Sequence, residues 1–344
     1  MGMKTSGIKY LGAKTKLIPQ IMSASCHAGD VRSVIDVFTG TTRVGQAFRE
    51  SGLRVITSDM SAYSADFSRC YLQATPEDIE IVTPIIARLN ELPGIRGWIT
   101  QNYAEAITKG GNVIKYLHPK NASRGDAIRD HIEEISGDIT GVQKSILITS
   151  LIMALDRVDS SVGIQQAYLR EYAARALNDM NLTIPVIPAG PTGTHFAGDA
   201  LEIVYPEADL AYGDPPYSAH NYGTYYHIWD SISKWDKPDV GLTTNRRVDR
   251  IGDRTPKSMW NGPKALEAFR ELFERLPTKH ILMSYSDDSK LVKRADLLEL
   301  CHEFGQVKQW EIDYKRNIMS TIGNASGNEE HVTQNHELLF LISR

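Results

Sequence analysis

Short apolar runs alternate with amphipathic segments over the first 70 residues, a pattern typical of an α/β sheet. Residues 33–38 are rich in β-branched side chains and stop at a Thr-Gly pair, which predicts a strand that enters a turn. A helix is expected over residues 44–51, closed by Gly52, and a second strand over residues 53–57. This strand–helix–strand unit is of the doubly wound kind, whose ligands bind at the carboxyl ends of the strands.

Helical spacing dominates the next part of the chain, from about residue 75 to residue 190. The sequence Thr-Pro-Glu-Asp at residues 75–78 indicates a helix start, and residues 143–159 predict a largely apolar helix. Residues 185–193 contain three prolines and two glycines, which is typical of a linker that leaves the helical segment.

Strand patterns return after residue 191, in apolar runs over residues 208–212, 280–285, 307–314 and 337–342. The alternation of strands and helices therefore resumes where the helical segment ends. We expect one α/β domain formed by residues 1–74 and 191–344, interrupted by a mostly helical insertion over residues 75–190.

Composition limits the class of protein. The chain has 344 residues, of which 42% are hydrophobic and 23% charged, so a disordered or collagen-like chain is excluded. The longest strongly apolar stretch, residues 145–155, is too short to span a bilayer, and residues 1–12 lack the apolar run of a signal peptide. The three cysteines are scattered without a CxxC pair, which argues against a disulfide framework or a Cys-rich zinc site. We expect a cytoplasmic protein.

The strongest chemical signal is the sequence Asp-Pro-Pro-Tyr at residues 214–217, directly after a predicted strand. Pro215 and Pro216 stiffen the loop and lack backbone donors, so its carbonyls are free to accept hydrogen bonds. Asp214 and the Pro215 carbonyl can accept the two hydrogens of an exocyclic amine while Tyr217 stacks on its ring. A proline-rich turn with a capping aspartate is the less favoured alternative.

A second signal lies where the first predicted strand meets the following helix, at residues 36–45. It combines a strand end, a glycine turn and a helix N-terminus, and it lacks the GxGxxG pattern of a dinucleotide oxidoreductase. Asp59 ends the second strand about 20 residues further on, where a carboxylate can bind ribose hydroxyls. An ordinary strand-end aspartate is an equally good interpretation of Asp59 taken alone.

The third signal, residues 9–14, imitates a phosphate-binding loop when it is read together with Gly7. The spacing is one residue too long, and no apolar strand precedes it, so a nucleotide triphosphatase is rejected. A lysine and an aromatic side chain beside a tight glycine turn are instead suited to hold a carboxylate and a cationic centre.

Together these motifs (YxGxK, DxFxG, an acid after the next strand, and DPPY) resemble the D12-class, Dam-type DNA adenine-N6 methyltransferases. The similarity continues through Tyr222 and residues 225–227, as in the restriction-modification branch of that family. It covers about residues 7–63 and 194–344, and the helical segment between them resembles the family only loosely.

The resemblance implies a Rossmann-like sheet that binds S-adenosylmethionine, no metal, and catalysis by residues 214–217. In the family, the positions matching Tyr10, Lys14, Asp59 and Asp214 bind S-adenosylmethionine, those matching Asp36, Phe38 and Gly40 line its methionine end, and the acid matching Asp199 contacts its adenine. A surface turn is the alternative for Asp199. The chain departs from its branch after DPPY, at Ser218, His220 and Asn221, which affects the expected base pocket.

The implied reaction is methylation of the N6 amine of an adenine flipped out of duplex DNA, since an amine within the duplex cannot reach the methyl donor. No cysteine follows a proline, which argues against a C5-cytosine enzyme. N4-cytosine enzymes usually have serine where this chain has Asp214. An N4-cytosine methyltransferase, or a non-catalytic DNA-binding protein on a methylase scaffold, remains the alternative.

The net charge of −4 argues against a globally cationic nucleic-acid binder, but phosphate contacts need only a local basic stripe. Residues 243–264 supply one that also contains Trp260, with a solvated charged loop as the alternative. The candidate DNA-binding residues here and in a second segment are Arg246, Arg247, Arg250, Arg254, Lys257, Lys315 and Arg316. By analogy with the family, residues 75–190 form part of the target-recognition surface. The implied partners are double-stranded DNA and a cognate restriction endonuclease that acts separately.

Overall fold

The computed structural model describes residues 4–108, 110–165, 168–216, 222–240, 258–287, 289–314 and 335–344.

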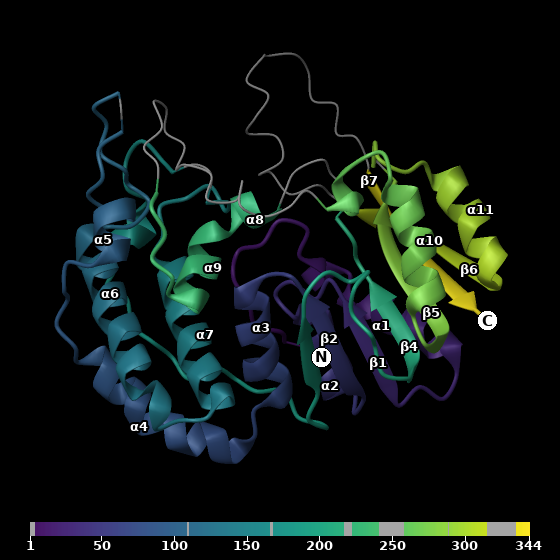
Figure 1. Cartoon of the computed structure of the whole chain (residues 1–344), viewed down its shortest axis with the longest axis horizontal. Helices are drawn as coiled ribbons and strands as arrows, with labels where there is room; N and C mark the ends of the chain where they lie inside the picture. Colours follow the sequence, from purple (N-terminus) through teal and green to yellow (C-terminus); the bar gives the residue numbers. More distant parts are fainter. Residues whose placement is uncertain are drawn as a thin grey trace.

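A seven-stranded sheet with the strand order β3-β2-β1-β4-β5-β7-β6 occupies the right-hand side of the described part of the molecule in Figure 1. Its strands are β1 (Ser33–Val37), β2 (Arg54–Asp59), β3 (Thr194–Ala197), β4 (Ala208–Gly213), β5 (Thr278–Ser286), β6 (Gln306–Tyr314) and β7 (Asn335–Ser343). Strand β7 pairs antiparallel with both β5 and β6, while the pairs from β3 through β5 are parallel. The predicted Rossmann-like α/β sheet is confirmed.

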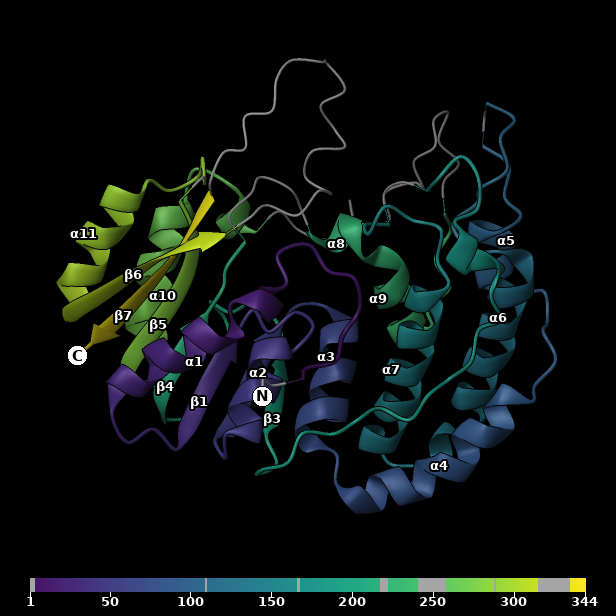
Figure 2. The same ribbon diagram turned by 180° about the vertical axis from the view of Figure 1, so that it is seen from behind.

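Helices cover both faces of this sheet, and the alternation of side chains along the strands explains why (Figures 1 and 2). On β1, Val34 joins the core cluster beneath α1, α2 and α3, whereas Ile35 points into the cluster beneath α10 and α11. Parallel strands buried on both faces need such apolar runs. The covering helices are α1 (Ile18–Ser25), α2 (Arg43–Glu50), α3 (Ala62–Ser68), α10 (Ala265–Arg275) and α11 (Arg294–Phe304).

The segment between β2 and β3 is helical beyond α3 and lies beside α3 and α9, at one side of the sheet (Figures 1 and 2). Its α-helices in the described residues are α4 (Pro76–Asn90), α5 (Trp98–Tyr103), α6 (Pro119–Glu134) and α7 (Gly141–Arg157). Two more, α8 (Tyr222–Tyr225) and α9 (His227–Lys234), follow β4. Short helical turns are η1 (Lys14–Lys16), η2 (Cys26–Ala28), η3 (Arg69–Gln73), η4 (Ile135–Gly137), η5 (Ala174–Leu177) and η7 (Met259–Asn261). Every helix in the described residues is too short or too polar to traverse a lipid bilayer.

Capping residues set the starts of the two helices that the sequence predicts in this segment. The Thr75 hydroxyl accepts from the Asp78 backbone N–H, and the Asp78 carboxylate accepts from the Thr75 N–H. Thr140 and Gln143 form the same reciprocal arrangement, so α7 starts at Gly141, two residues before the predicted start. Both predicted helices are confirmed with small shifts of their ends.

Candidate active site

Acidic side chains follow four neighbouring strands at the carboxyl edge of the sheet. Asp59 ends β2, Asp36 lies near the end of β1, Asp214 comes directly after β4, and Asp199 follows β3. The chain runs outward from β1 to β3 and then returns to place β4 on the other side of β1. The edge between β1 and β4 is therefore the topological switch point, where open α/β sheets bind their ligands.

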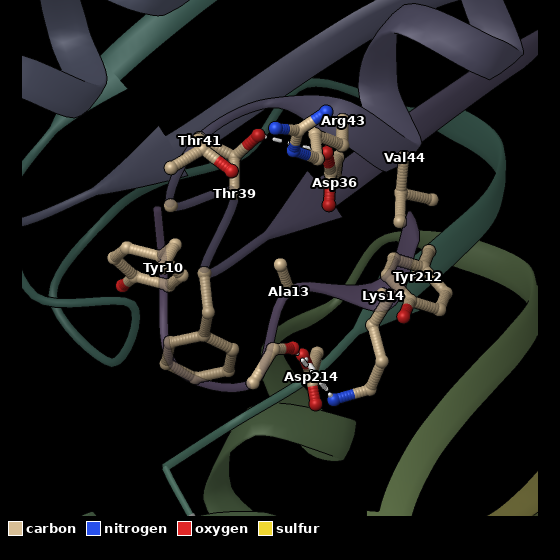
Figure 3. Close-up of a pocket in the computed structure, with 13 residues that line it drawn as sticks. Tyr10, Ala13, Lys14, Asp36, Thr39, Thr41, Arg43, Val44, Tyr212 and Asp214 are labelled. Carbon is tan, nitrogen blue, oxygen red and sulfur yellow. Dashed lines mark hydrogen bonds and ion pairs between the residues drawn. The ribbon is translucent and has the colours of Figure 1, made fainter. Parts of the chain in front are cut away.

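A pocket opens at this switch point (Figure 3). It is lined by Tyr10, Gly12, Ala13, Lys14, Asp36, Phe38, Thr39, Gly40, Thr41, Arg43, Val44, Tyr212 and Asp214. All three sequence motifs thus contribute side chains to one cavity, although they are far apart in the chain. Asp59 and Asp199 do not line it and lie further along the same edge, beyond β1.

Lys14, the last residue of the YxGxK motif, contacts the aspartate of the DPPY motif. Its ammonium lies 2.7 Å from Asp214 Oδ2 and points toward it in Figure 3. The same ammonium lies 3.3 Å from Oε1 of Glu337, at the start of β7. The second carboxylate oxygen of Asp214, Oδ1, is buried and has no hydrogen-bond partner among the described residues. Burial raises the pKa of Asp214 to about 6, against the opposing effect of the Lys14 charge.

Asp36 holds the turn that follows β1. Its Oδ2 accepts a 2.8 Å hydrogen bond from the Thr39 hydroxyl, and burial raises the pKa of its carboxyl to about 7. A Cβ on Gly45, in the first turn of α2, would lie 2.9 Å from the same oxygen. The close approach of the helix to Asp36 therefore requires glycine at this position.

The backbone of the turn is contorted, since Phe38, Gly40 and Thr42 all have positive φ angles. The Gly40 N–H donates to Asp59 Oδ2 at 2.9 Å, which joins the ends of β1 and β2. The Tyr10 ring lies on the other side of Gly40, 3.3 Å from where a Cβ would stand. Asp59 thus shapes the pocket without lining it.

Aromatic contacts fix the position of Tyr10. Its ring stacks on Tyr226 with centroids 4.5 Å apart and planes 22° apart. The Tyr226 hydroxyl accepts a 2.6 Å hydrogen bond from the Leu11 backbone N–H. The predicted Tyr-x-Gly-x-Lys loop is therefore held from the side of α8 and α9, between which Tyr226 lies.

A charged cluster holds the same loop against the helical segment. The Lys9 ammonium lies 2.5 Å from Oδ1 of Asp159, a residue just beyond α7, and also donates to the Asp156 carbonyl. Asp156 Oδ2 accepts from the Lys9 backbone N–H at 3.1 Å. Arg175 lies 3.0 Å from Asp159 Oδ1 and completes the cluster. Lys9 is thus a structural tether and does not line the pocket.

Asp199 lies in a turn after β3, and its Oδ1 accepts from the Leu201 N–H at 3.0 Å. The sequence did not predict β3 as a strand, because Thr194–Ala197 is a short, partly exposed edge strand with little apolar character. Its pairing of Asp59 with Ala197 brings Asp199 close to the end of β2.

Two features of the site differ from the sequence interpretation. Trp260, grouped with the basic stripe, is buried and packs edge-on against Phe38 at 4.9 Å and Phe269 at 5.2 Å, so it belongs to the core. Glu337 was missed as a member of the site. The signal that could have found it is an acid at the start of an otherwise apolar strand, which lies at the carboxyl edge only if that strand is antiparallel.

Several predicted residues lie outside the described part of the chain: Tyr217, Arg246, Arg247, Arg250, Arg254, Lys257, Lys315 and Arg316. Pro215 and Pro216 are described, and they follow Asp214 directly at the end of β4.

Comparison with known proteins gives one family. A family model described as D12 class N6 adenine-specific DNA methyltransferase matches residues 10–285. The type II methyltransferase M.NlaIII of Neisseria lactamica is 26% identical over 318 residues, which cover 90% of this chain and 92% of that protein. The type II methyltransferase M.CviAII of Paramecium bursaria Chlorella virus 1 is 25% identical over 327 residues, covering 92% and 95%.

A longer relative, modification methylase StsI of Streptococcus sanguinis, is 28% identical over 359 residues, and the match spans 98% of this chain but only 52% of StsI. Similarity to solved structures is weak. Magnesium protoporphyrin IX methyltransferase from Synechocystis PCC 6803 with bound SAH matches 97% of this chain and 89% of that chain at 7% identity and a TM-score of 0.35.

The family model spans most of the chain, including all three motifs that meet at the switch point. The chain therefore belongs to the D12 class of N6 adenine-specific DNA methyltransferases.

Proposed function

We propose that Asp214 holds the N6 amine of a flipped-out adenine while a methyl group is transferred to it from S-adenosylmethionine bound in the switch-point pocket. One observation carries this assignment. Asp214 Oδ2 is held by Lys14 at 2.7 Å, whereas Oδ1 is buried beside the pocket without a hydrogen-bond partner among the described residues. A buried acceptor without a donor is costly, and an incoming amine would satisfy it.

The residues of the pocket fit S-adenosylmethionine, a ligand with two cationic groups and one carboxylate. Asp36 and Asp214 are the acids that line the pocket, and Lys14 and Arg43 are its basic residues. Because Gly40 has no side chain, its backbone leaves space beside the Tyr10 ring, and a Cβ would reduce that space. When bound, the cofactor supplies an electrophilic methyl group on sulfur.

The remaining acids at the sheet edge suit the nucleoside end of this ligand. Asp59 lies one strand away from the pocket, and its carboxylate is oriented by the Gly40 and Ser61 N–H groups. Asp199 lies one strand further. We assign ribose binding to Asp59 and adenine contact to Asp199, while Tyr10, Lys14, Phe38 and Gly40 enclose the methionine end.

Two acceptors in a stiff loop would prepare the target amine for attack. Asp214 Oδ1 and the Pro215 carbonyl would accept its two hydrogens and draw the nitrogen toward a tetrahedral geometry, which frees its lone pair. Pro216 keeps the loop rigid. Tyr217 is assigned to stacking on the flipped base, a prediction that lies outside the described residues.

We assign the helical segment, residues 75–190, to target recognition. The basic candidates within residues 246–257 and 315–316 are assigned to phosphate contact. The relatives are named type II methyltransferases and modification methylases. The proposed role is therefore modification of cytoplasmic double-stranded DNA beside a separately acting restriction endonuclease.

An Asp214→Asn substitution tests the central assignment, because it removes the negative charge and leaves a similar shape. Turnover on unmethylated bacterial genomic DNA should fall by at least about 10²-fold. The affinity for S-adenosylhomocysteine should fall by a smaller factor. Mass spectrometry of digested DNA would measure N6-methyladenine and N4-methylcytosine separately.

Asp209→Asn is the matched control. Asp209 lies on the same strand, β4, but near its opposite end, where it accepts hydrogen bonds from Arg32 and Ser33. It should retain turnover. Turnover of Asp214→Asn within tenfold of the wild type would remove Asp214 from the chemistry.

A further inference from the structure

Glu337 reaches the site from a strand that carries no recognised motif. It lies near the start of β7, and because β7 runs antiparallel to β5, this start lies at the carboxyl edge of the sheet. Its Oε1 accepts a 2.6 Å hydrogen bond from the Ser284 hydroxyl and lies 3.3 Å from the Lys14 ammonium. The Glu337 side chain is only 7% exposed. It is therefore a buried neighbour of the Lys14–Asp214 ion pair.

The Lys14 ammonium thus lies between two carboxylates, Asp214 and Glu337. Lys14 itself is 5% exposed, so the three charges interact where water screens them little. With both acids ionised, the cluster carries one excess negative charge. A buried carboxylate beyond what Lys14 needs costs stability, and the assignments made above give it no role.

We propose that Glu337 is a positioning residue for methyl transfer, which draws the Lys14 ammonium toward β7 and so fixes the direction in which Asp214 presents its Oδ1 atom. This inference rests on the proposed role of Asp214. During transfer, the amine nitrogen bonds to the methyl carbon as the carbon–sulfur bond breaks, the positive charge passes from sulfur to nitrogen, and the nitrogen then releases a proton to solvent water. The excess negative charge of the cluster stabilises this cationic nitrogen more than an uncharged cluster would.

The groups facing Asp214 define how Glu337 affects its ionisation. They are Lys14 from η1, Asp36 from β1, Tyr212 from β4 and Glu337 from β7. Lys14 lowers the pKa of Asp214 and Glu337 raises it. Removing the charge of Glu337 ends its repulsion of the Asp214 carboxylate. It also lets the Lys14 ammonium pair with Asp214 without a competing carboxylate. Both changes lower the pKa of Asp214.

Glu337→Gln tests the inference, since it keeps the size of the side chain and an acceptor for Ser284. On unmethylated bacterial genomic DNA with S-adenosylmethionine, kcat should fall by roughly tenfold with a smaller change in KM for the cofactor. The acidic limb of the pH profile, where Asp214 must be ionised, should move to lower pH.

Two further variants separate positioning from folding. Glu337→Asp keeps the charge and should retain the acidic limb of the wild type with a partial loss of kcat. Glu311→Gln makes the same chemical change at an exposed acid on the neighbouring strand β6, where it pairs with Arg294, and should leave kcat and the pH profile unchanged.

The outcomes are distinguishable. Absence of DNA methylation by the wild-type chain would refute the proposed function itself. An active wild type with a Glu337→Gln variant of equal kcat and equal acidic limb would overturn the positioning role. A Glu337→Gln variant that loses activity only in proportion to its folded fraction, with the acidic limb unmoved, would also overturn it and leave Glu337 a structural residue.

Discussion

At the scale of single residues, the Gly40 backbone connects the turn after β1 to Asp59 and to the Tyr10 ring. Its φ of 51° lies in the left-handed region, its N–H donates to Asp59, and its Cα faces the Tyr10 ring. A side chain here would be strained by the backbone and would press on Tyr10 at 3.3 Å. Glycine therefore sets both the stability and the shape of the pocket.

Gly40→Ala should lower the free energy of unfolding by about 1–2 kcal/mol because of the positive φ. It should also weaken S-adenosylhomocysteine binding by at least about tenfold, because the Tyr10 ring must move. Thermal unfolding and titration calorimetry measure the two effects.

Gly52→Ala is the control for backbone strain alone, since Gly52 has a φ of 90° with nothing near its Cβ position. It should lose similar stability and bind the ligand normally. Equal binding by both variants would show that Gly40 does not shape the pocket.

The site residues that the sequence could predict are those in local motifs. Three of them, Lys14, Asp36 and Asp214, each belong to a short sequence motif that indicates a chemical role. The fold brings all three into one pocket. Glu337 lies outside such motifs, and Tyr226 stands in a segment, residues 225–227, that the sequence marks only by its similarity to the family. Their contacts depend on the direction of β7 and on the packing of the α8–α9 segment, neither of which is encoded by neighbouring residues.

At the scale of elements, the loop before η1 is held by α7 and the segment that follows it. Lys9 pairs with Asp159, which is 2% exposed and also lies within 3.0 Å of Arg175. Burial raises the pKa of neighbouring Asp156 to about 7, and the Lys9 charge opposes this effect. The tether connects the helical segment to the loop that carries Tyr10.

Lys9→Met should lower the free energy of unfolding by about 2 kcal/mol, because the buried carboxylates of Asp156 and Asp159 lose the ammonium that lies against them. It should also weaken cofactor binding, since the following loop loses its anchor. Lys115→Met is the matched control. Lys115 pairs with the exposed Glu171, so its loss should cost less than about 1 kcal/mol. A Lys9→Met variant as stable as Lys115→Met would contradict the tether.

Most elements could be predicted because their apolar periodicity is strong. The strand predicted at residues 208–212 is observed as Ala208–Gly213, and that at 280–285 as Thr278–Ser286. Strand β3 could not be predicted from its pattern, since at the sheet edge it forms one strand pair and buries little. Pairing with β2, a tertiary effect, decides its conformation.

At the scale of the whole molecule, one apolar core runs from the sheet into the helical segment. Val34 on β1 and Leu210 on β4 belong to the same buried cluster as Ile128 on α6 and Leu151 on α7. The sequence separates residues 75–190 from the rest by their helical pattern, but it gives no sign of this shared core. The division into a catalytic part and a target-recognition part remains a prediction about function.

The shared core fixes the helical segment, for which we propose a role in target recognition, relative to the pocket. The Lys9–Asp159 ion pair connects the loop before η1 to the residues just beyond α7. The Tyr10–Tyr226 stack connects the same loop to the segment of α8 and α9. Contacts made with DNA by these helices would therefore act on a site of fixed geometry.

The most direct test is long-read sequencing of genomic DNA from a methylation-free bacterial host that expresses this chain, beside a host that expresses Asp214→Asn. N6-methyladenine at one recurrent sequence motif, absent with the variant, is the predicted result. Soluble wild-type chain that leaves no N6-methyladenine, or a mark that persists with Asp214→Asn, would contradict the account.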